Sequence, residues 1–320
     1  WYLYENSSNK DLKRYASLFT DRINKEQYNK GTHDLGFMLY CSYGNALRIT
    51  GADSCKSVLI NGSKSLSTRF NSKIGCIQSW GSNQKWSFPV IIDNMMNLEL
   101  LFWAARNGGG QYLYDIACKH AETTMKHQFR KDYSCYHVAV YDTLDGHFIK
   151  GVTHQGLSDD SMWARGQAWA IYGYTMVYRE THDVRFLDFA RKVSDVYLSR
   201  LPEDMIPYWD FNAPELSSGE PKDASASAIT ASALLELSTY INDSDSAFFY
   251  RNKAVEMLQI LSSPAYQARN KKDAFLLHSV GHMNKGWEVD ASISYADYYY
   301  LEALVRLKRL KEKQSVLANL

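Results

Sequence analysis

The chain has 320 residues, of which 45% are hydrophobic, and its formal net charge at pH 7 is +1. This length and apolar content allow either one large core or two smaller domains. The balanced charge offers no basic surface for nucleic acid or for an anionic membrane. No apolar stretch approaches the length of a membrane span, so we expect a soluble protein with no membrane partner.

The cysteines show no metal-binding or disulfide pattern. Five cysteines are scattered without a CxxC pair. Their odd number argues against a disulfide framework, and their spacing argues against a zinc site. We therefore expect most of them to be buried as small apolar residues. The positions are Cys41, Cys55, Cys76, Cys118 and Cys135.

One kind of connector recurs along the chain and predicts helical hairpins. Each copy is a short polar turn between two helical apolar patterns, and Asn, Gly, Ser or Asp supply the turn and the N-cap. Five such connectors predict five αα-hairpins. They read "YENSSNKDLKRYA", "RITGADSCKSVL", "RNGGGQYLYDIA", "RETHDVRFLDFA" and "YINDSDSAFFYRNKA".

The helices are of two kinds. Residues 10–23 and 183–201 have charged faces, which suit an outer layer. Residues 93–105, 223–237 and 295–307 are apolar or rich in small residues, which suits an inner ring. Two alternating kinds of helix predict an all-α fold, an (α/α)6 six-hairpin barrel that forms one domain over residues 1–320. We count about eleven helices and expect the first helix of the barrel to be absent, because the chain opens partway through a helical pattern.

An open helical solenoid, such as a tetratricopeptide array, has the same periodicity. The irregular spacing of the hairpins and the aromatic-rich long loops at 71–91, 130–159, 202–222 and 263–291 argue against it. Strand-like sequence is confined to residues 135–142, which we expect to pair with residues 146–151 as a small β-hairpin.

Acidic and aromatic residues gather where the inner helices begin. If these helices start at one mouth of a barrel, their first turns converge there. An Asp in such a position is most simply an N-cap, which stabilises a helix by about 1 kcal/mol. We prefer that interpretation for Asp159, Asp160 and Asp223, although Asp159 and Asp160 are also candidate partners for Arg165.

Asp34 and Asp93 are less easily explained as caps. Asp34 follows His33 and leads into an apolar helix, and Asp93 follows the apolar run "WSFPVII". A carboxylic acid among apolar groups keeps its proton to a higher pH, as a general acid requires near neutrality. Two carboxylates that face an aromatic pocket are typical of enzymes that cleave or hydrate sugars.

Arg165 and Trp169 lie one helical turn apart and share a face, which Tyr172 extends by a further turn. A guanidinium can grip a carboxylate, and an indole offers a flat apolar surface to a sugar ring. The simpler alternatives are core packing for Trp169 and a buried ion pair with an Asp for Arg165.

Several of these stretches together point to a family. "THDLGFM", "IIDNMMNLELLFWA", "THQGLSDDSMWARGQAWAIYGYTMVYRET", "DASASAITASALLEL" and "VDASISYADYYYLEALVRLKR" resemble, in order, the unsaturated glucuronyl hydrolases of glycoside hydrolase family 88. The resemblance covers nearly the whole chain. It implies an (α/α)6 barrel in a bacterial protein of the cytoplasm or periplasm, and it places the family's N-terminal segment before Trp1. It also implies neither a metal nor an organic cofactor, in agreement with the lack of ligand-spaced clusters.

The resemblance implies a small-molecule substrate, the unsaturated oligosaccharide that a polysaccharide lyase releases from a glycosaminoglycan. The enzyme would protonate C4 of the terminal 4,5-unsaturated uronic acid and add water at C5, after which the product rearranges and the glycosidic bond opens. By motif, Asp93 matches the general acid/base and Asp34 the second essential carboxylate. The residues that match substrate-binding positions are His33, His137, Gln155, Arg165, Trp169 and Ser279.

The late loop "LLHSVGHMNKGWEVD" departs from relatives that bind a substrate sulfate with hydroxyl residues and a Lys. Here Ser279 stands alone, followed by His282, Asn284 and Lys285. The preferred glycosaminoglycan and its sulfation therefore stay open, as does the oligomeric state.

Three other functions remain alternatives. A hydrolase of unsaturated rhamnogalacturonan fragments would share the chemistry, but its Arg-bearing helix usually lacks the Gln-Ala-Trp ending found here. A sugar 2-epimerase on the same barrel would need a His pair, for which His137 and His278 are the candidates. A non-enzymatic helical scaffold would expose a polar groove instead of burying carboxylates beside aromatic residues.

Overall fold

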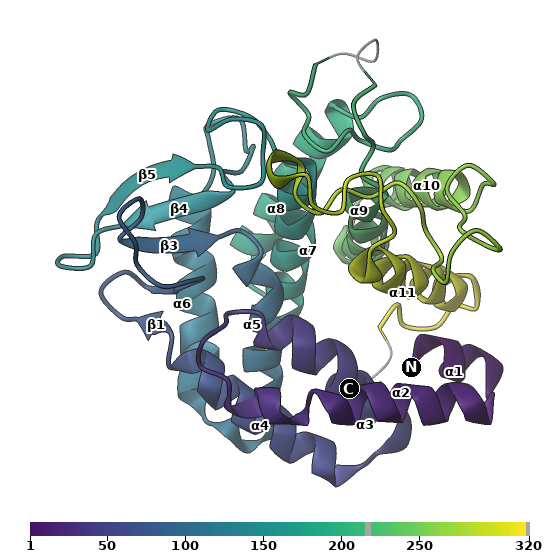
Figure 1. Cartoon of the computed structure of the whole chain (residues 1–320), viewed down its shortest axis with the longest axis horizontal. Coiled ribbons are helices and arrows are strands. Elements are labelled where there is room, and N and C mark those ends of the chain that lie inside the picture. Colours follow the sequence, from purple (N-terminus) through teal and green to yellow (C-terminus); the bar gives the residue numbers. More distant parts are fainter. Residues whose placement is uncertain (215–218, 318–320) are drawn as a thin grey trace. The chain divides into compact units, whose positions relative to one another are not determined.

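A computed structural model of the chain describes residues 1–214 and 219–317 (Figure 1). These residues form two compact units. Unit 1 comprises Trp1–His127 and Ala139–Lys150, and unit 2 comprises Gln128–Val138 and Gly151–Leu317. In the described ranges no helix is long and apolar enough to cross a membrane. All five cysteines are free, and Cys55, Cys76 and Cys135 are buried as expected.

Unit 1 contains the N-terminal helices and most of a small sheet. Its helices are α1 (Tyr2–Ser7), α2 (Lys10–Arg22), the 3-10 helix η1 (Asn24–Tyr28), the π-helix η2 (Gly36–Gly44), α3 (Asn45–Thr50), α4 (Asp53–Ser67), α5 (Asn94–Ala104), the π-helical turn η3 (Ala105–Gly109) and α6 (Gln111–His127). Its strands are β1 (Phe70–Asn71), β2 (Cys76–Ile77), β3 (Phe88–Ile91) and most of β4 (Val138–Tyr141) and β5 (Phe148–Val152).

The expected β-hairpin is present as β4 and β5, but it belongs to a larger sheet. The strand order is β3-β4-β5, and β1 pairs separately with β2 (Figure 1). Our restriction of strands to one hairpin was therefore wrong. β1, β2 and β3 are only two to four residues long, too short for a period of two to stand out. Pro89 within β3 fits the edge position of that strand, because proline cannot donate to a neighbouring strand.

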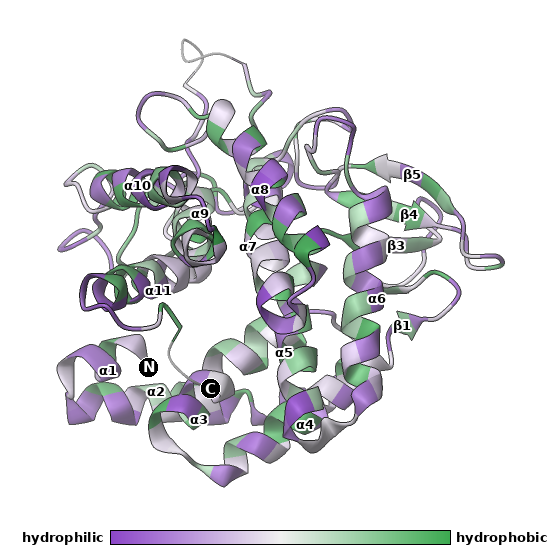
Figure 2. Cartoon of the chain, turned by 180° about the vertical axis from the view of Figure 1, so that it is seen from behind, coloured by the Kyte–Doolittle hydropathy of each residue, from purple (hydrophilic) through white to green (hydrophobic). Residues whose placement is uncertain are grey.

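Helices α5 and α2 confirm the expected inner and outer kinds in unit 1. In α5 every residue except Glu99 is buried, and the helix packs against α6, η2 and α4. In α2 the buried residue is Thr20, and the polar face carries most of the charge. Figure 2 shows α6 alternating between hydrophilic and hydrophobic colours along its length, as an amphipathic covering helix does.

Unit 2 is built around three inner helices. It contains α7 (Ala164–Thr181), α8 (Val184–Ser199), α9 (Ala224–Leu237), the 3-10 helix η5 (Ser238–Tyr240), α10 (Ser244–Leu261), the 3-10 helix η6 (Met283–Lys285) and α11 (Ser294–Lys311). α9 packs against α7, α10 and α11 and is buried at every position. Its Ala and Ser residues allow this close approach on all sides. α8 packs on α7 and is amphipathic, as expected of an outer helix.

The structure confirms all five predicted hairpins. They are α1–α2, α3–α4, α5–α6, α7–α8 and α9–α10. The polar residues of the connectors cap the second helices: the side chains of Asn9, Asp183 and Asp243 accept hydrogen bonds from the backbone at the starts of α2, α8 and α10. Gly51 ends α3 in the left-handed conformation that glycine favours. Residues 215–218 of the expected 202–222 loop lie outside the described residues.

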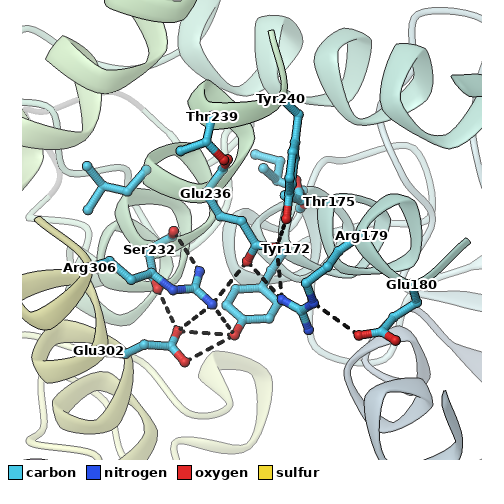
Figure 3. A network of polar contacts seen from close by, with 12 residues as sticks. Tyr172, Thr175, Arg179, Glu180, Ser232, Glu236, Thr239, Tyr240, Glu302 and Arg306 are labelled. Carbon is cyan, nitrogen blue, oxygen red and sulfur yellow. Dashed lines mark hydrogen bonds and ion pairs between the residues drawn. The ribbon is translucent and has the colours of Figure 1, made fainter. Parts of the chain in front are cut away.

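A network of buried charges joins the C-terminal halves of α7, α9 and α11 (Figure 3). Glu236 receives two hydrogen bonds from Arg179, of 2.8 and 3.0 Å, and lies 3.1 Å from the guanidinium of Arg306. Arg306 also donates to the carbonyl oxygen of Ser232 and to the hydroxyl of Tyr172. The Tyr172 hydroxyl in turn donates to Glu302. Ion pairs thus join α9 to α7 and to α11, and hydrogen bonds of the Tyr172 hydroxyl join α7 to α11.

Glu236 is ionised in this network although it is 1% exposed. Burial alone would raise the pKa of its carboxyl, but Arg179, Arg306 and the Tyr240 hydroxyl overcome that effect and hold the pKa below the usual value of 4.5. A carboxyl with a lowered pKa in the folded state stabilises the fold above its unfolded pKa. This stabilisation is lost as the pH falls through the folded pKa.

We therefore predict that Glu236→Gln destabilises the protein at pH 7, because two arginines lose their buried counter-charge. The expected loss in the free energy of unfolding is about 3–5 kcal/mol, measured by urea denaturation. The wild type should lose stability on acidification below about pH 4.5, and the variant should lose less over that range.

The matched control is Glu256→Gln, which removes a carboxylate paired with Lys253 near the surface of α10. Its effect should stay within about 1 kcal/mol. Equal effects of the two substitutions would contradict the role given to the network.

Candidate functional site

Asp34 and Asp93 both lie in unit 1, each at the start of a buried helix. Asp34 precedes η2, and Asp93 is the N-cap residue of α5. The side chain of Asp93 makes no capping hydrogen bond to a backbone N–H. Both residues are half-buried. Helix capping therefore does not explain the presence of Asp93 at this position.

A glycine brings the two helix starts together. η2 packs on α5, and a Cβ added to Gly36 would lie 2.4 Å from the Cα of Asn97, closer than real contacts allow. The side-chain oxygen of Asn97 accepts a 3.0 Å hydrogen bond from the backbone N–H of Phe37. Gly36 stands two residues after Asp34, and Asn97 four residues after Asp93. The segment that follows Asp34 therefore packs against the first turns of α5, the helix that begins after Asp93.

Ser79 links the surroundings of the two carboxylates. Its hydroxyl lies 3.1 Å from the side-chain oxygen of Asn94, the neighbour of Asp93, and accepts a hydrogen bond from the N–H of Ile91. Its carbonyl oxygen lies 2.6 Å from Nδ1 of His33, the neighbour of Asp34. Sequence reasoning missed Ser79 because a serine in a loop carries no pattern. The polar residues Asn94 and Asn97 within an otherwise apolar inner helix were the available signal.

His33 stands between Ser79 and Asp34. The side chain is 11% exposed, and its Nε2 lies 3.2 Å from Oδ1 of Asp34, whose side chain is 42% exposed. Burial, the largest effect, lowers the pKa of His33, while the Asp34 carboxylate opposes that shift. The Trp80 ring approaches the His33 ring edge-on, with 6.5 Å between the ring centroids. Trp80 is a further aromatic neighbour that the sequence did not single out.

The remaining predicted residues lie in unit 2, where Arg165 is the centre of one group. Its buried guanidinium lies 3.1 Å from the carboxylate of Asp223 and donates to the carbonyl oxygens of Val280 and Gly281. The rings of Trp163 and Tyr295 lie 4.5 and 5.1 Å from its central carbon. Arg165 thus ties the starts of α7 and α9 to the 279–291 loop.

The three aspartates that we expected to cap helices differ in their contacts. Asp223 caps α9 through the N–H of Ser225, as expected, and also pairs with Arg165. Asp159 is exposed and accepts a hydrogen bond from the N–H of Thr153. The N-cap position of α7 belongs to Trp163, so the expectation that Asp159 or Asp160 caps this helix was wrong.

His137 and Gln155 form a second group in unit 2. Nδ1 of His137 accepts hydrogen bonds from the backbone N–H groups of His154 and Gln155, at 3.1 and 3.0 Å. The proton of a neutral His137 ring must therefore be on Nε2. The amide of Gln155 donates to the carbonyl oxygen of Gly281, so this group meets the 279–291 loop as well.

Trp169 and Ser279 are both buried. The Trp169 ring contacts the edges of Tyr295 and Tyr299, with centroid separations of 6.2 and 5.4 Å. The Ser279 hydroxyl has no hydrogen-bond partner among the described residues. His282 lies on the same loop, 8% exposed, and neither of its ring nitrogens has a hydrogen-bond partner in those ranges.

The predicted site residues thus gather as two groups, one in each unit. Unit 1 holds the two carboxylates with His33, and unit 2 holds the aromatic, amide and guanidinium groups.

One further group of residues could be considered for a cation. Ligand atoms of Asp142, Asp145 and His147 lie within 4.8 Å of one another in the loop between β4 and β5. Hydrogen bonds within the loop explain this arrangement, since Asp145 accepts from the backbone N–H of His147 and lies 2.6 Å from its Nδ1. The group is exposed and shares no residue with the predicted site, so we assign it no cofactor.

Comparison with known proteins matches residues 2–308 to the sequence model of Glycosyl Hydrolase Family 88. An unsaturated glucuronyl hydrolase from Formosa agariphila is 46% identical over 97% of this chain and 78% of its own length. An unsaturated chondroitin disaccharide hydrolase from Streptococcus pneumoniae is 35% identical over 96% of this chain and 78% of its own.

A solved structure agrees with these sequence relatives. The crystal structure of an unsaturated glucuronyl hydrolase specific for heparin is 48% identical, with a TM-score of 0.93 over 98% of this chain and 84% of its own. The comparison confirms the expected fold class, the helical α/α barrel with small β-hairpins in its loops. The chain is therefore a glycoside hydrolase and belongs to Glycosyl Hydrolase Family 88.

Proposed function

We propose that the protein removes the terminal 4,5-unsaturated uronic acid from glycosaminoglycan disaccharides released by a polysaccharide lyase. The observation that carries the proposal is the pair Asp34 and Asp93, linked through Ser79 and His33 in a chain whose relatives are named for this activity. We also propose that residues 1–320 form one catalytic domain.

In the proposed reaction Asp93 is the general acid and base. Its carboxyl donates a proton to C4 of the C4=C5 double bond, and it then takes a proton from the water that attacks C5. The product is a hemiketal, which opens and releases the second sugar. Asp93 suits the role because its half-buried carboxyl stands at the start of the buried helix α5. Asp34 would accept hydrogen bonds from sugar hydroxyls, since its carboxyl is partly exposed while its neighbour His33 is buried.

The proposed binding residues are His137, Gln155, Arg165, Trp169 and Ser279. Trp169 would offer an apolar face to the sugar ring. Arg165 and Gln155 both donate to backbone carbonyls of the 279–291 loop, so we propose that they shape the binding wall as well as attract the uronate. The buried Ser279 hydroxyl, which has no hydrogen-bond partner in the part of the chain that the structure describes, would approach the second sugar.

The structure disfavours a sugar 2-epimerase with His137 and His278 as acid and base. Nδ1 of His137 is occupied by two backbone N–H groups. His278 lies 2.5 Å from the Asp290 carboxylate in an exposed position. The pectin branch shares the hydration chemistry, and only a substrate comparison separates it from the proposed activity.

We predict that lyase-generated glycosaminoglycan disaccharides lose their ultraviolet absorbance on incubation with the protein, because hydration removes the conjugated C4=C5 bond. The panel should include chondroitin, hyaluronan and heparin products, with and without sulfate. An unsaturated rhamnogalacturonan disaccharide serves as the competing substrate. A folded protein that turns over only the pectin product would contradict the proposal.

We further predict that Asp93→Asn lowers kcat by about 10²–10⁴-fold or more with little change in KM, because the amide cannot donate or accept the transferred proton. The same absorbance assay measures the loss. Asp115→Asn, an isosteric change at an exposed position on α6, should keep wild-type kcat. A loss at Asp93 smaller than tenfold would mean that another carboxyl transfers the proton.

A further inference from the structure

The imidazole of His33 is held at both of its nitrogens by groups of unit 1. Nδ1 lies 2.6 Å from the carbonyl oxygen of Ser79, and Nε2 lies 3.2 Å from Oδ1 of Asp34. A carbonyl oxygen can only accept a hydrogen bond, so Nδ1 must carry a proton. A neutral imidazole has one N–H only, and Nε2 would then present a lone pair to the carboxylate. The 3.2 Å contact with Asp34 becomes attractive only when Nε2 carries a second proton.

With this shared proton on Nε2, an imidazolium faces the Asp34 carboxylate as an ion pair. Loss of the shared proton leaves a lone pair facing a carboxylate and removes the attraction that fixes Asp34.

We propose that His33 is a positioning residue that shares a proton with Asp34 and thereby holds this carboxyl in the orientation that receives the sugar. The proposal rests on the function proposed above. It changes the predicted role of His33, which was direct substrate binding. The side chain is 11% exposed and both nitrogens face protein groups, whereas the Asp34 side chain is 42% exposed. His33 therefore acts through Asp34.

The charged and titratable groups that face His33 come from three elements. Asp34 lies on its own segment, Arg69 follows α4, and His120 lies on α6. Arg69 donates a 3.0 Å hydrogen bond to the same Ser79 carbonyl oxygen, which keeps that oxygen fixed as an acceptor. His120 is fully buried, and burial lowers its pKa to about 3, so it stays neutral under assay conditions. Among the groups that face His33, Asp34 therefore supplies the negative charge.

The pH dependence follows from the burial of the pair. Burial, reinforced by Arg69, lowers the pKa of His33 below 6.5 in spite of Asp34. The shared proton is present below that folded pKa and is lost as the pH rises through it. Productive binding should therefore weaken on the alkaline side, where Asp34 loses its partner.

The first experiment observes the protons directly in the resting protein. In ¹⁵N-histidine-labelled wild-type protein, with His33 assigned through bonds to its backbone, the Nδ1 shift should remain that of a protonated nitrogen from about pH 5 to pH 8. The Nε2 shift should change as the shared proton is lost. An unprotonated Nδ1 at any pH in this range would overturn the proposal. This measurement requires no turnover, so it stands even if no disaccharide proves to be a substrate.

The second experiment compares kcat/KM against pH for wild type, His33→Gln and His33→Ala, with His147→Gln as the matched control in the exposed β4–β5 loop. We expect His33→Ala to lose about 10- to 100-fold in kcat/KM, as expected for a lost charge-assisted hydrogen bond. His33→Gln can still donate to Asp34 but cannot titrate. It should recover activity to within about tenfold of wild type and should lack the alkaline fall.

Two outcomes of the second experiment would overturn the proposal. One is an alkaline fall in His33→Gln that matches the wild type. The other is an equal loss in the Gln and Ala variants, both folded by circular dichroism, which would show that the side chain only fills space. A wild-type protein that turns over no disaccharide would instead contradict the proposed function. The ring-nitrogen chemical shifts of His33 would then be the only test of the His33–Asp34 pair.

Discussion

The hydrogen bonds of Ser79 determine the arrangement on which the chemistry of unit 1 depends. One backbone carbonyl and one hydroxyl reach toward the neighbours of two carboxylates that are 59 residues apart in the sequence. The 71–93 segment is therefore a structural part of the site and more than a connection between helices. Because a carbonyl oxygen cannot donate, this single contact also fixes which nitrogen of His33 carries a proton.

In unit 2 the guanidinium of Arg165 holds neighbouring segments together through its hydrogen bonds, as Ser79 does in unit 1. Arg165 is buried at the start of α7, where only a counter-charge and full hydrogen bonding make an ion tolerable. Asp223 and the carbonyls of Val280 and Gly281 supply both. At the other ends of the same helices, Glu236 and its arginines do so again. α7 and α9 are thus joined by a buried ion pair near each end, and α9 and α11 by one near their C-terminal ends.

The sequence predicted the repeated elements well and the irregular ones poorly. Hairpin connectors have strong local signals, such as Asn9, Asp183 and Asp243, and the caps formed where these residues predicted them. β3 was missed because four residues beside a proline do not establish a period. Asp34, Asp93 and Arg165 stand out in the sequence and remain predicted site residues, and Arg165 forms the buried ion pair with an Asp that was its simpler alternative. Their partners Ser79 and Val280 could not be found, because contacts through backbone carbonyls leave no trace in side-chain identity.

The contacts of the 279–291 loop have a further consequence for how such an enzyme can change its substrate. Arg165 and Gln155 bind carbonyl oxygens of this loop, and Asn284 binds the carbonyl oxygen of Gly156 across from it. A hydrogen bond to a main-chain oxygen does not depend on the side chain of the residue that carries this oxygen. Apart from Asn284, whose side chain is itself an anchor, and Gly286, which adopts the left-handed conformation, positions 282 to 289 can therefore exchange residues while the loop keeps its path. Selectivity for different sugars can evolve, or be engineered, by substitution on a fixed backbone without rebuilding the helices beneath it.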